Sequence, residues 1–139
     1  MLGADVIKIE SRRRSDGARR RPASGVEASE GDLDSSLRFS AINLNKRSVS
    51  LDLSHPKGRA LAKQLAELAD VVIENFRPGV ARRLGLGYED LSAKNPGLVM
   101  ASISARGQSG PDTKLPGYAS IFAAVGGASH LTGYPDLRP

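Results

Sequence analysis

The chain has 139 residues, the size of one domain, and its 40% hydrophobic and 25% charged residues are typical of a soluble globular protein. It has no cysteine, which excludes a disulfide scaffold, a thiol nucleophile and a cysteine-based metal site. The net charge of +5 arises between Ser11 and Pro22, where arginines outnumber a single aspartate. Apolar runs are far shorter than the roughly 20 residues that span a bilayer, and no signal peptide is recognisable, so we expect a cytoplasmic protein.

The N-terminal part predicts one strand followed by a long loop. Val6–Ile9 is a short apolar run that predicts a strand at about residues 5–9. Residues 10–38 are rich in Arg, Ser, Gly and acidic residues without apolar periodicity, and they predict a long basic loop that is partly mobile.

A strand and a helix are expected next. Alternation of polar and apolar residues predicts a strand at 48–53, and a helix then begins at Ser54 or His55 with Pro56 in its first turn. The helix is expected to bury one apolar stripe, formed by Leu61, Leu65 and Leu68.

The rest of the chain alternates strands with helices. The β-branched run Val71–Ile73 predicts a central parallel strand at 71–74 that is buried on both faces. The other expected elements are a short helix at 80–84, a helical turn at 88–91, a strand at 98–103, and a helix at 118–131 weakened by Gly126 and Gly127. Strands that alternate with helices predict an α/β fold, a Rossmann-like parallel sheet with flanking helices.

Candidate binding residues follow the predicted strands, because open parallel sheets bind ligands beyond the carboxyl ends of their strands. These positions are 75–77 and 104–110. Asn75 and Arg77 offer hydrogen-bond donors and Phe76 a flat apolar face, a set that suits a nucleotide with phosphates. The alternative is a structural turn in which Asn75 bonds its own backbone and Phe76 fills the core.

Other chemistries find little support. His55 and His130 have no ligand partners at metal-binding spacing, so no metal site is expected. Gly85-Leu86-Gly87 lacks the third glycine of a dinucleotide fingerprint, and no serine lies in a Gly-x-Ser-x-Gly elbow. The arginine cluster suits a solvated loop, cofactor phosphates or a nucleic acid, the last being least favoured because no aromatic residue interleaves with the arginines.

Five segments, taken in order, resemble one known family. They are Gly3–Glu10, Asn45–Leu53, Ala69–Gly79, Leu84–Tyr88 and Gly107–Pro111. In these segments the chain is similar to the family III CoA-transferases, also called the CaiB/BaiF family. The resemblance implies that residues 1–139 are part of a Rossmann-like large domain, in an interlocked homodimer that transfers CoA between carboxylic acids through an aspartyl-CoA thioester. Acyl-CoA and carboxylic acids are the implied substrates, without a metal or a membrane partner.

The resemblance also implies which residues contact coenzyme A. Arg19 resembles the arginine of the family's Gly-Asp-x-x-Arg motif, although Ser15 replaces the glycine, and it would meet a CoA phosphate. The other implied CoA-binding residues are Leu51, Asp52, Leu53, Ser54, Asn75, Phe76, Arg77, Arg83, Pro116, Gly117, Tyr118 and Ala119. Arginine matches phosphate oxygens with its forked donors, which fits this ligand.

Three departures from the family pattern qualify the expected activity. The family begins about one strand and one helix before Met1, and its nucleophilic Asp is expected beyond Pro139, so no catalytic residue is expected in this fragment. Ala119 stands where the family often has an acidic residue. Asp136, in a Pro-containing turn, is expected to be an ordinary carboxylate.

Two alternatives remain open. The related α-methylacyl-CoA racemases have a proton-transferring His where this chain has Tyr118, and a phenol with a pKa near 10 is a poor base at neutral pH. The second alternative is a non-catalytic remnant, or a basic protein that binds polyanions.

Overall fold

The structure is a computed structural model that describes residues 3–20 and 36–133. The chain divides into two compact units, Met1–Gln64 and Leu65–Pro139. Each unit contains one pair of parallel strands, β1 with β2 and β3 with β4. Parallel strands that alternate with helices confirm the predicted α/β class.

In the first unit, β1 (Val6–Glu10) pairs in parallel with β2 (Lys46–Ser50), from Val6 opposite Lys46 to Glu10 opposite Ser50. Between them lie α1 (Gly17–Arg20) and α2 (Leu37–Ile42). The structure differs from the expected loop at 10–38 in three described places: Glu10 belongs to β1, and short helices form at 17–20 and from residue 37. Residues 21–35 lie outside the described residues.

Local side-chain bonds explain why these short helices form. The Asp16 carboxylate accepts the N–H of Ala18 at 2.8 Å, and the Ser36 hydroxyl accepts the N–H of Phe39 at 3.3 Å. Such bonds satisfy N–H groups that have no partner within the first helical turn. Asp16 and Ser36 are residue types that commonly begin helices. The sequence still did not predict these helices, because they are too short to show apolar periodicity.

Helix α3 (Pro56–Glu67) begins where the sequence predicts, and the His55 Nδ1 accepts the N–H of Lys57 at 3.2 Å. Its buried face differs from the prediction. Ala62 and Ala66 are buried, whereas Leu61 is half exposed and Leu68, just beyond the helix, is 87% exposed. The predicted leucine stripe is wrong because the small alanine side chains allow closer packing on their own face.

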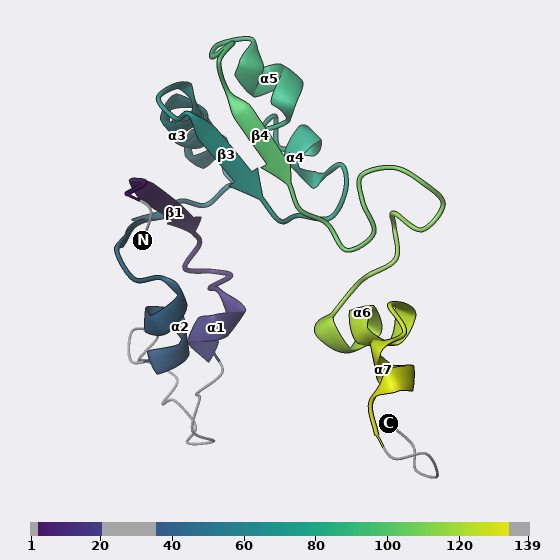
Figure 1. The fold of residues 1–139 in the computed structure, drawn as a ribbon. Coiled ribbons are helices and arrows are strands. Elements are labelled where there is room, and N and C mark those ends of the chain that lie inside the picture. The colour runs from purple at the N-terminus through teal and green to yellow at the C-terminus, as the bar shows by residue number, and fades with distance from the viewer. Residues whose placement is uncertain (1–2, 21–35, 134–139) are drawn as a thin grey trace. The chain divides into compact units, whose positions relative to one another are not determined.

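In the second unit, β3 (Val71–Glu74) pairs in parallel with β4 (Val99–Ser102), from Val71 opposite Val99 to Glu74 opposite Ser102. The crossover runs through α4 (Val80–Arg83) and α5 (Tyr88–Ser92), as the sequence predicts. Figure 1 shows β3 and β4 as neighbouring arrows with the same direction.

The core of the second unit lies on one face of this strand pair. Buried Ala66, Leu91 and Leu98 form a cluster against which Val72, Leu86 and Met100 pack. The Asn95 amide donates to the carbonyl oxygens of Ala66 and Ala69 at 3.3 and 2.8 Å, which satisfies two acceptors at the end of α3.

The other face of the pair is open, so the prediction that residues 71–73 are buried on both faces is wrong. Val71, Ile73 and the cross-strand Val99 are 53%, 67% and 61% exposed. A run of β-branched residues reports strand propensity and apolarity, but it does not state whether both faces are covered.

The predicted helix at 118–131 is divided into α6 (Ala119–Val125) and α7 (Ala128–Leu131). Gly127 has a φ of 79°, a left-handed conformation that side chains disfavour, and it separates the two helices. The expected weakening at Gly126 and Gly127 is confirmed. Within the described ranges no helix is long and apolar enough to cross a membrane.

Candidate functional site

A pocket of about 270 Å³ lies in the second unit, directly beyond the carboxyl ends of β3 and β4. Its lining includes six residues that the resemblance implies for CoA, Asn75, Phe76, Arg77, Pro116, Gly117 and Tyr118. It also includes Pro78, Ile103, Ser104, Ala105, Thr113, Leu115 and Phe122. This is the place where open parallel sheets bind ligands.

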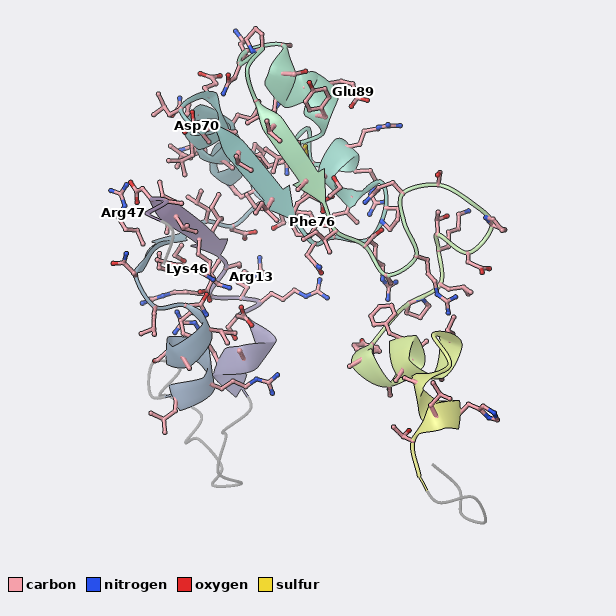
Figure 2. The ribbon with its side chains drawn as sticks, viewed as in Figure 1. Arg13, Lys46, Arg47, Asp70, Phe76 and Glu89 are labelled. Atoms are coloured by element: carbon pink, nitrogen blue, oxygen red, sulfur yellow. The ribbon has the colours of Figure 1, made fainter. Side chains whose placement is uncertain are left out.

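The turn after β3 forms one wall of the pocket. The Glu74 carboxylate accepts the N–H of Phe76 at 2.7 Å and bends the chain as the strand ends. The Val80 N–H donates to the carbonyl of Arg77 at 3.0 Å, which closes the turn into α4. Figure 2 shows Phe76 at the end of β3. Phe76 is 37% exposed, so the alternative that it fills the core is not what the structure has.

The opposite wall is built by the segment from Thr113 to Phe122. Gly117 lies so close to its neighbours that an added Cβ would be 2.6 Å from the Cβ of Ala105 and would overlap the ring of Phe122. Gly117 therefore permits contact between the loop after β4 and the start of α6. Beside it, Tyr118 is largely exposed and Phe122 is partly exposed, and the two rings give the pocket an aromatic margin.

Ser104 is the polar residue that the sequence reasoning placed near the site without assigning it a role. It lies two residues beyond β4 and lines the pocket. Its hydroxyl oxygen is buried and has no hydrogen-bond partner among the described residues, a property shared with the Nε of Arg106. Position after a strand indicated Ser104, but a missing partner cannot be read from a sequence.

Two of the implied CoA-binding residues of this unit do not line the pocket. Arg83 is the exposed last residue of α4, and Ala119 is the first residue of α6. Next to Arg83, the side chain of Arg82 lies 3.7 Å from Glu89 in an exposed ion pair.

The remaining implied residues belong to the first unit. Leu51, Asp52, Leu53 and Ser54 form the turn between β2 and α3. The Asp52 carboxylate accepts from the N–H and the hydroxyl of Ser54 at 2.9 and 2.5 Å, and these hydrogen bonds hold the pKa of Asp52 below its ordinary value. The Arg59 guanidinium donates to the carbonyls of Leu53 and Ser54 at 3.2 and 2.8 Å. The turn is thus fixed from both sides.

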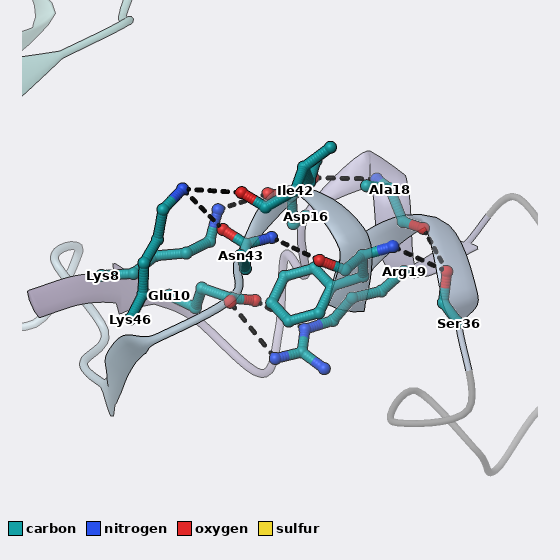
Figure 3. Close-up of polar contacts among 10 residues, drawn as sticks. Lys8, Glu10, Asp16, Ala18, Arg19, Ser36, Ile42, Asn43 and Lys46 are labelled. Carbon is teal, nitrogen blue, oxygen red and sulfur yellow. Dashed lines mark hydrogen bonds and ion pairs between the residues drawn. The ribbon is translucent and has the colours of Figure 1, made fainter. Parts of the chain in front are cut away.

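Arg19 lies in a separate cluster of the first unit (Figure 3). Its Nε donates to Glu10 at 2.9 Å, both side chains are nearly buried, and its guanidinium stacks 3.4 Å from the centre of the Phe39 ring. Nearby, a hydrogen bond of 2.5 Å from Lys8 is the main reason that the pKa of Asp16 lies below its ordinary value of 3.8. Arg19 therefore joins β1, α1 and α2, and a role at a CoA phosphate stays a prediction.

The residues that line the pocket are suited to binding a ligand and not to catalysing a reaction. None of the described residues that line it is Asp, Glu, His or Cys, so the lining offers no carboxylate or thiol nucleophile and no imidazole base. Apolar and aromatic side chains with a few hydrogen-bonding groups are typical of a site for a small molecule or cofactor. Across residues 3–20 and 36–133, no three potential metal ligands gather.

Comparison with known proteins adds an independent observation. The sequence model of one family, described as CoA-transferase family III, matches residues 1–139. The chain is 42% identical to succinyl-CoA–D-citramalate CoA-transferase of Chloroflexus aurantiacus and 41% identical to succinate–glutarate CoA-transferase of Agrobacterium fabrum. Each match covers 99% of this chain but only 33% and 34% of those proteins, respectively, so the chain spans about a third of their length.

A solved structure of the same family also matches this chain. The crystal structure of a CaiB/BaiF family protein from Brucella suis matches with a TM-score of 0.84 and 39% identity, over 99% of this chain and 36% of that protein.

Proposed function

This chain belongs to CoA-transferase family III, and we propose that it supplies part of the coenzyme A site of an enzyme that moves CoA between carboxylic acids. The observation that carries the proposal is the pocket beyond β3 and β4, because six of the residues implied for CoA line one cavity at the expected end of the strands. The relatives named above transfer CoA to or from different dicarboxylic acids, so the acid itself is left open.

The chemical character of the pocket supports this assignment. CoA combines phosphates, an adenine and a long neutral arm that carries the thiol. Arg77 at the pocket offers a forked donor for phosphate oxygens, while Phe76, Leu115 and Phe122 offer apolar surface. A volume of about 270 Å³ is small for a ligand pocket, so it suits one portion of CoA better than the entire molecule.

The proposed reaction follows the family resemblance. An Asp carboxylate attacks the thioester carbonyl of the acyl-CoA, and the C–S bond breaks, so that CoA leaves as a thiolate and the acyl group remains on the Asp as a mixed anhydride. The thiolate then attacks the aspartyl carbonyl, which releases the donor acid and leaves CoA bound to the Asp as a thioester. The acceptor acid repeats these steps in reverse. The Asp is expected beyond residue 139, so the residues described here bind and orient CoA. The full-length protein would work as an interlocked cytoplasmic homodimer.

The test is a calorimetric titration of the chain with coenzyme A. We expect saturable binding that weakens about tenfold in Arg77→Ala and in Arg83→Ala, since a hydrogen bond to a charged group contributes about 1.5–3 kcal/mol. The matched control is Arg82→Ala, which removes the same charge from the residue beside Arg83 but is not implied in CoA binding.

A second titration with duplex DNA over a range of salt concentrations separates the alternatives. Affinity for DNA that falls steeply with salt, together with indifference to CoA, would overturn the proposal in favour of polyanion binding. Racemisation of an α-methylacyl-CoA by the full-length protein, without exchange of acids, would favour the racemase alternative.

A further inference from the structure

Among the described polar groups of the pocket, the Ser104 hydroxyl lacks the hydrogen bond that a buried polar group normally makes. Its oxygen is buried without a hydrogen-bond partner in the described part of the chain. A buried hydroxyl that lacks a partner destabilises the fold, because it has given up its hydrogen bonds to water. Alanine would avoid this penalty at the same position, so packing alone does not account for a serine here.

The surroundings of Ser104 connect it to the ligand site. It follows Ser102, the last residue of β4, by two positions and lines the pocket together with Asn75 and Phe76 from the end of β3. A serine side chain has a single rotatable bond with three staggered positions, so one rotamer change moves the oxygen without backbone motion. The hydroxyl can therefore leave its covered position when a partner enters the pocket.

We infer that Ser104 binds a neutral hydrogen-bonding group of coenzyme A, and that its hydroxyl lacks a partner until that ligand is bound. The inference rests on the proposed CoA binding and adds a contact that the implied set of residues does not include. A neutral group is favoured because Arg77 is the only charged residue among the described residues that line the pocket. CoA carries such groups in two places, the amides of its pantetheine arm and the edge of its adenine.

Stability and binding should change in different directions when the hydroxyl is removed. In Ser104→Ala, we expect the thermal midpoint of the ligand-free chain to stay the same or rise, because the orphan hydroxyl is lost. We expect the Kd for CoA to rise about threefold to tenfold, the loss of one neutral hydrogen bond. A serine with a merely structural bond would instead lower the midpoint.

Two further comparisons isolate the hydroxyl. Ser102→Ala makes the same chemical change at an exposed position of β4 that does not line the pocket, and should leave the Kd unchanged. Ser104→Thr and Ser104→Val have nearly the same shape and differ in the hydroxyl, so the threonine variant should bind CoA more tightly than the valine variant. Titrations with pantetheine and with adenosine bisphosphate then show which half of CoA meets Ser104.

The outcomes are distinct. If the unaltered chain does not bind CoA, the proposed function itself fails. If it binds CoA, then three results would each overturn the inference: equal Kd values for the unaltered chain and Ser104→Ala, equal affinities of Ser104→Thr and Ser104→Val, or a lower thermal midpoint for Ser104→Ala. A loss of affinity confined to pantetheine or to the nucleotide supports it and identifies the group.

Discussion

A half-buried ion pair of the first unit, Lys8 with Asp16, determines how Asp16 responds to pH. Asp16 accepts hydrogen bonds from Lys8 and from the N–H of Ala18, and the first of these is the main cause of its lowered pKa. Because the folded pKa lies below the ordinary value of 3.8, ionised Asp16 stabilises the fold above that value. This contribution is lost as the pH falls through the folded pKa.

We predict that Asp16→Asn lowers the free energy of unfolding at neutral pH by about 1 kcal/mol and reduces its decline in acid. Urea unfolding at a series of pH values from about 6 down to 2 measures both effects. Asp70→Asn is the matched control, because this exposed carboxylate has no ion pair in the described structure. Parallel pH curves for the unaltered protein and Asp16→Asn would contradict the prediction.

Arg59 shows how one residue can act on a binding segment without touching a ligand. Its guanidinium holds the carbonyls of Leu53 and Ser54, and both of these residues are implied in CoA binding. We predict that Arg59→Lys weakens CoA binding a few-fold, because a strongly hydrated ammonium on a flexible stem does not hold both carbonyls as the planar Nη1 group of Arg59 does. Circular dichroism should show unchanged secondary structure. Arg47→Lys, in an exposed pair with Asp5, is the control.

At the scale of elements, the start of α3 depends on the absence of a side chain. A Cβ at Gly58 would overlap the carbonyl oxygen of Asp52, so the helix and the turn before it approach as closely as a glycine permits. Helix propensity alone favours Ala over Gly by about 1 kcal/mol. The overlap of the added Cβ with Asp52 destabilises the protein instead. Because the Asp52 carbonyl belongs to the backbone and cannot move aside easily, this overlap should outweigh the gain in helix propensity.

We therefore predict that Gly58→Ala destabilises the protein by about 1–3 kcal/mol, the usual effect of overpacking. Gly97→Ala is the control, since its Cβ would meet only Asn95 Oδ1 at 3.8 Å. Equal unfolding midpoints in urea for the two variants would contradict the prediction, because they would mean that the turn at Asp52 moves to accommodate the added Cβ without loss of stability.

The elements also show what a sequence can and cannot predict here. The sequence predicts strand β3 at 71–74 and the strand lies there, because a β-branched run between polar residues is a strong local signal. It does not predict the buried face of α3, since the choice between a leucine stripe and an alanine pair depends on what packs against the helix. Alternation of elements is encoded locally, whereas burial depends on distant residues.

The residues of the candidate site likewise fall into those that the sequence predicts and those that it does not. Asn75, Phe76 and Arg77 could be predicted because they follow a recognisable strand, and the pocket includes them. Phe122 could not, because it reaches the pocket through the packing of Gly117 against Ala105 and Phe122 itself. A tertiary contact of this kind cannot be predicted from the pattern of neighbouring residues in the sequence.

At the scale of the whole molecule, we predict that the 139-residue polypeptide by itself does not transfer CoA. The pocket lining contains no carboxylate within the described residues, and the family's Asp is expected beyond residue 139. The polypeptide, mixed with an acyl-CoA and a panel of carboxylic acids, should yield no exchanged product and no CoA-linked protein by mass spectrometry. Exchange that disappears in Asp136→Asn, a residue outside the described ranges, would contradict this.

The two strand pairs also bear on the order in which the chain acquires its structure. Each pairing closes a long loop, and the longer loop of β1 with β2 adds only about 0.3 kcal/mol of closure entropy. That difference is too small to set an order. The crossover between β3 and β4, however, carries Leu91 of the buried cluster, whereas none of the described residues between β1 and β2 belongs to that cluster. The amides of Val99 and Ile103, bonded to Asp70 and Glu74, should therefore become protected against pulsed hydrogen exchange before the amide of Leu51. The strand ends that form one wall of the pocket would then be in place early in folding, and the turn at residues 51–54 would follow.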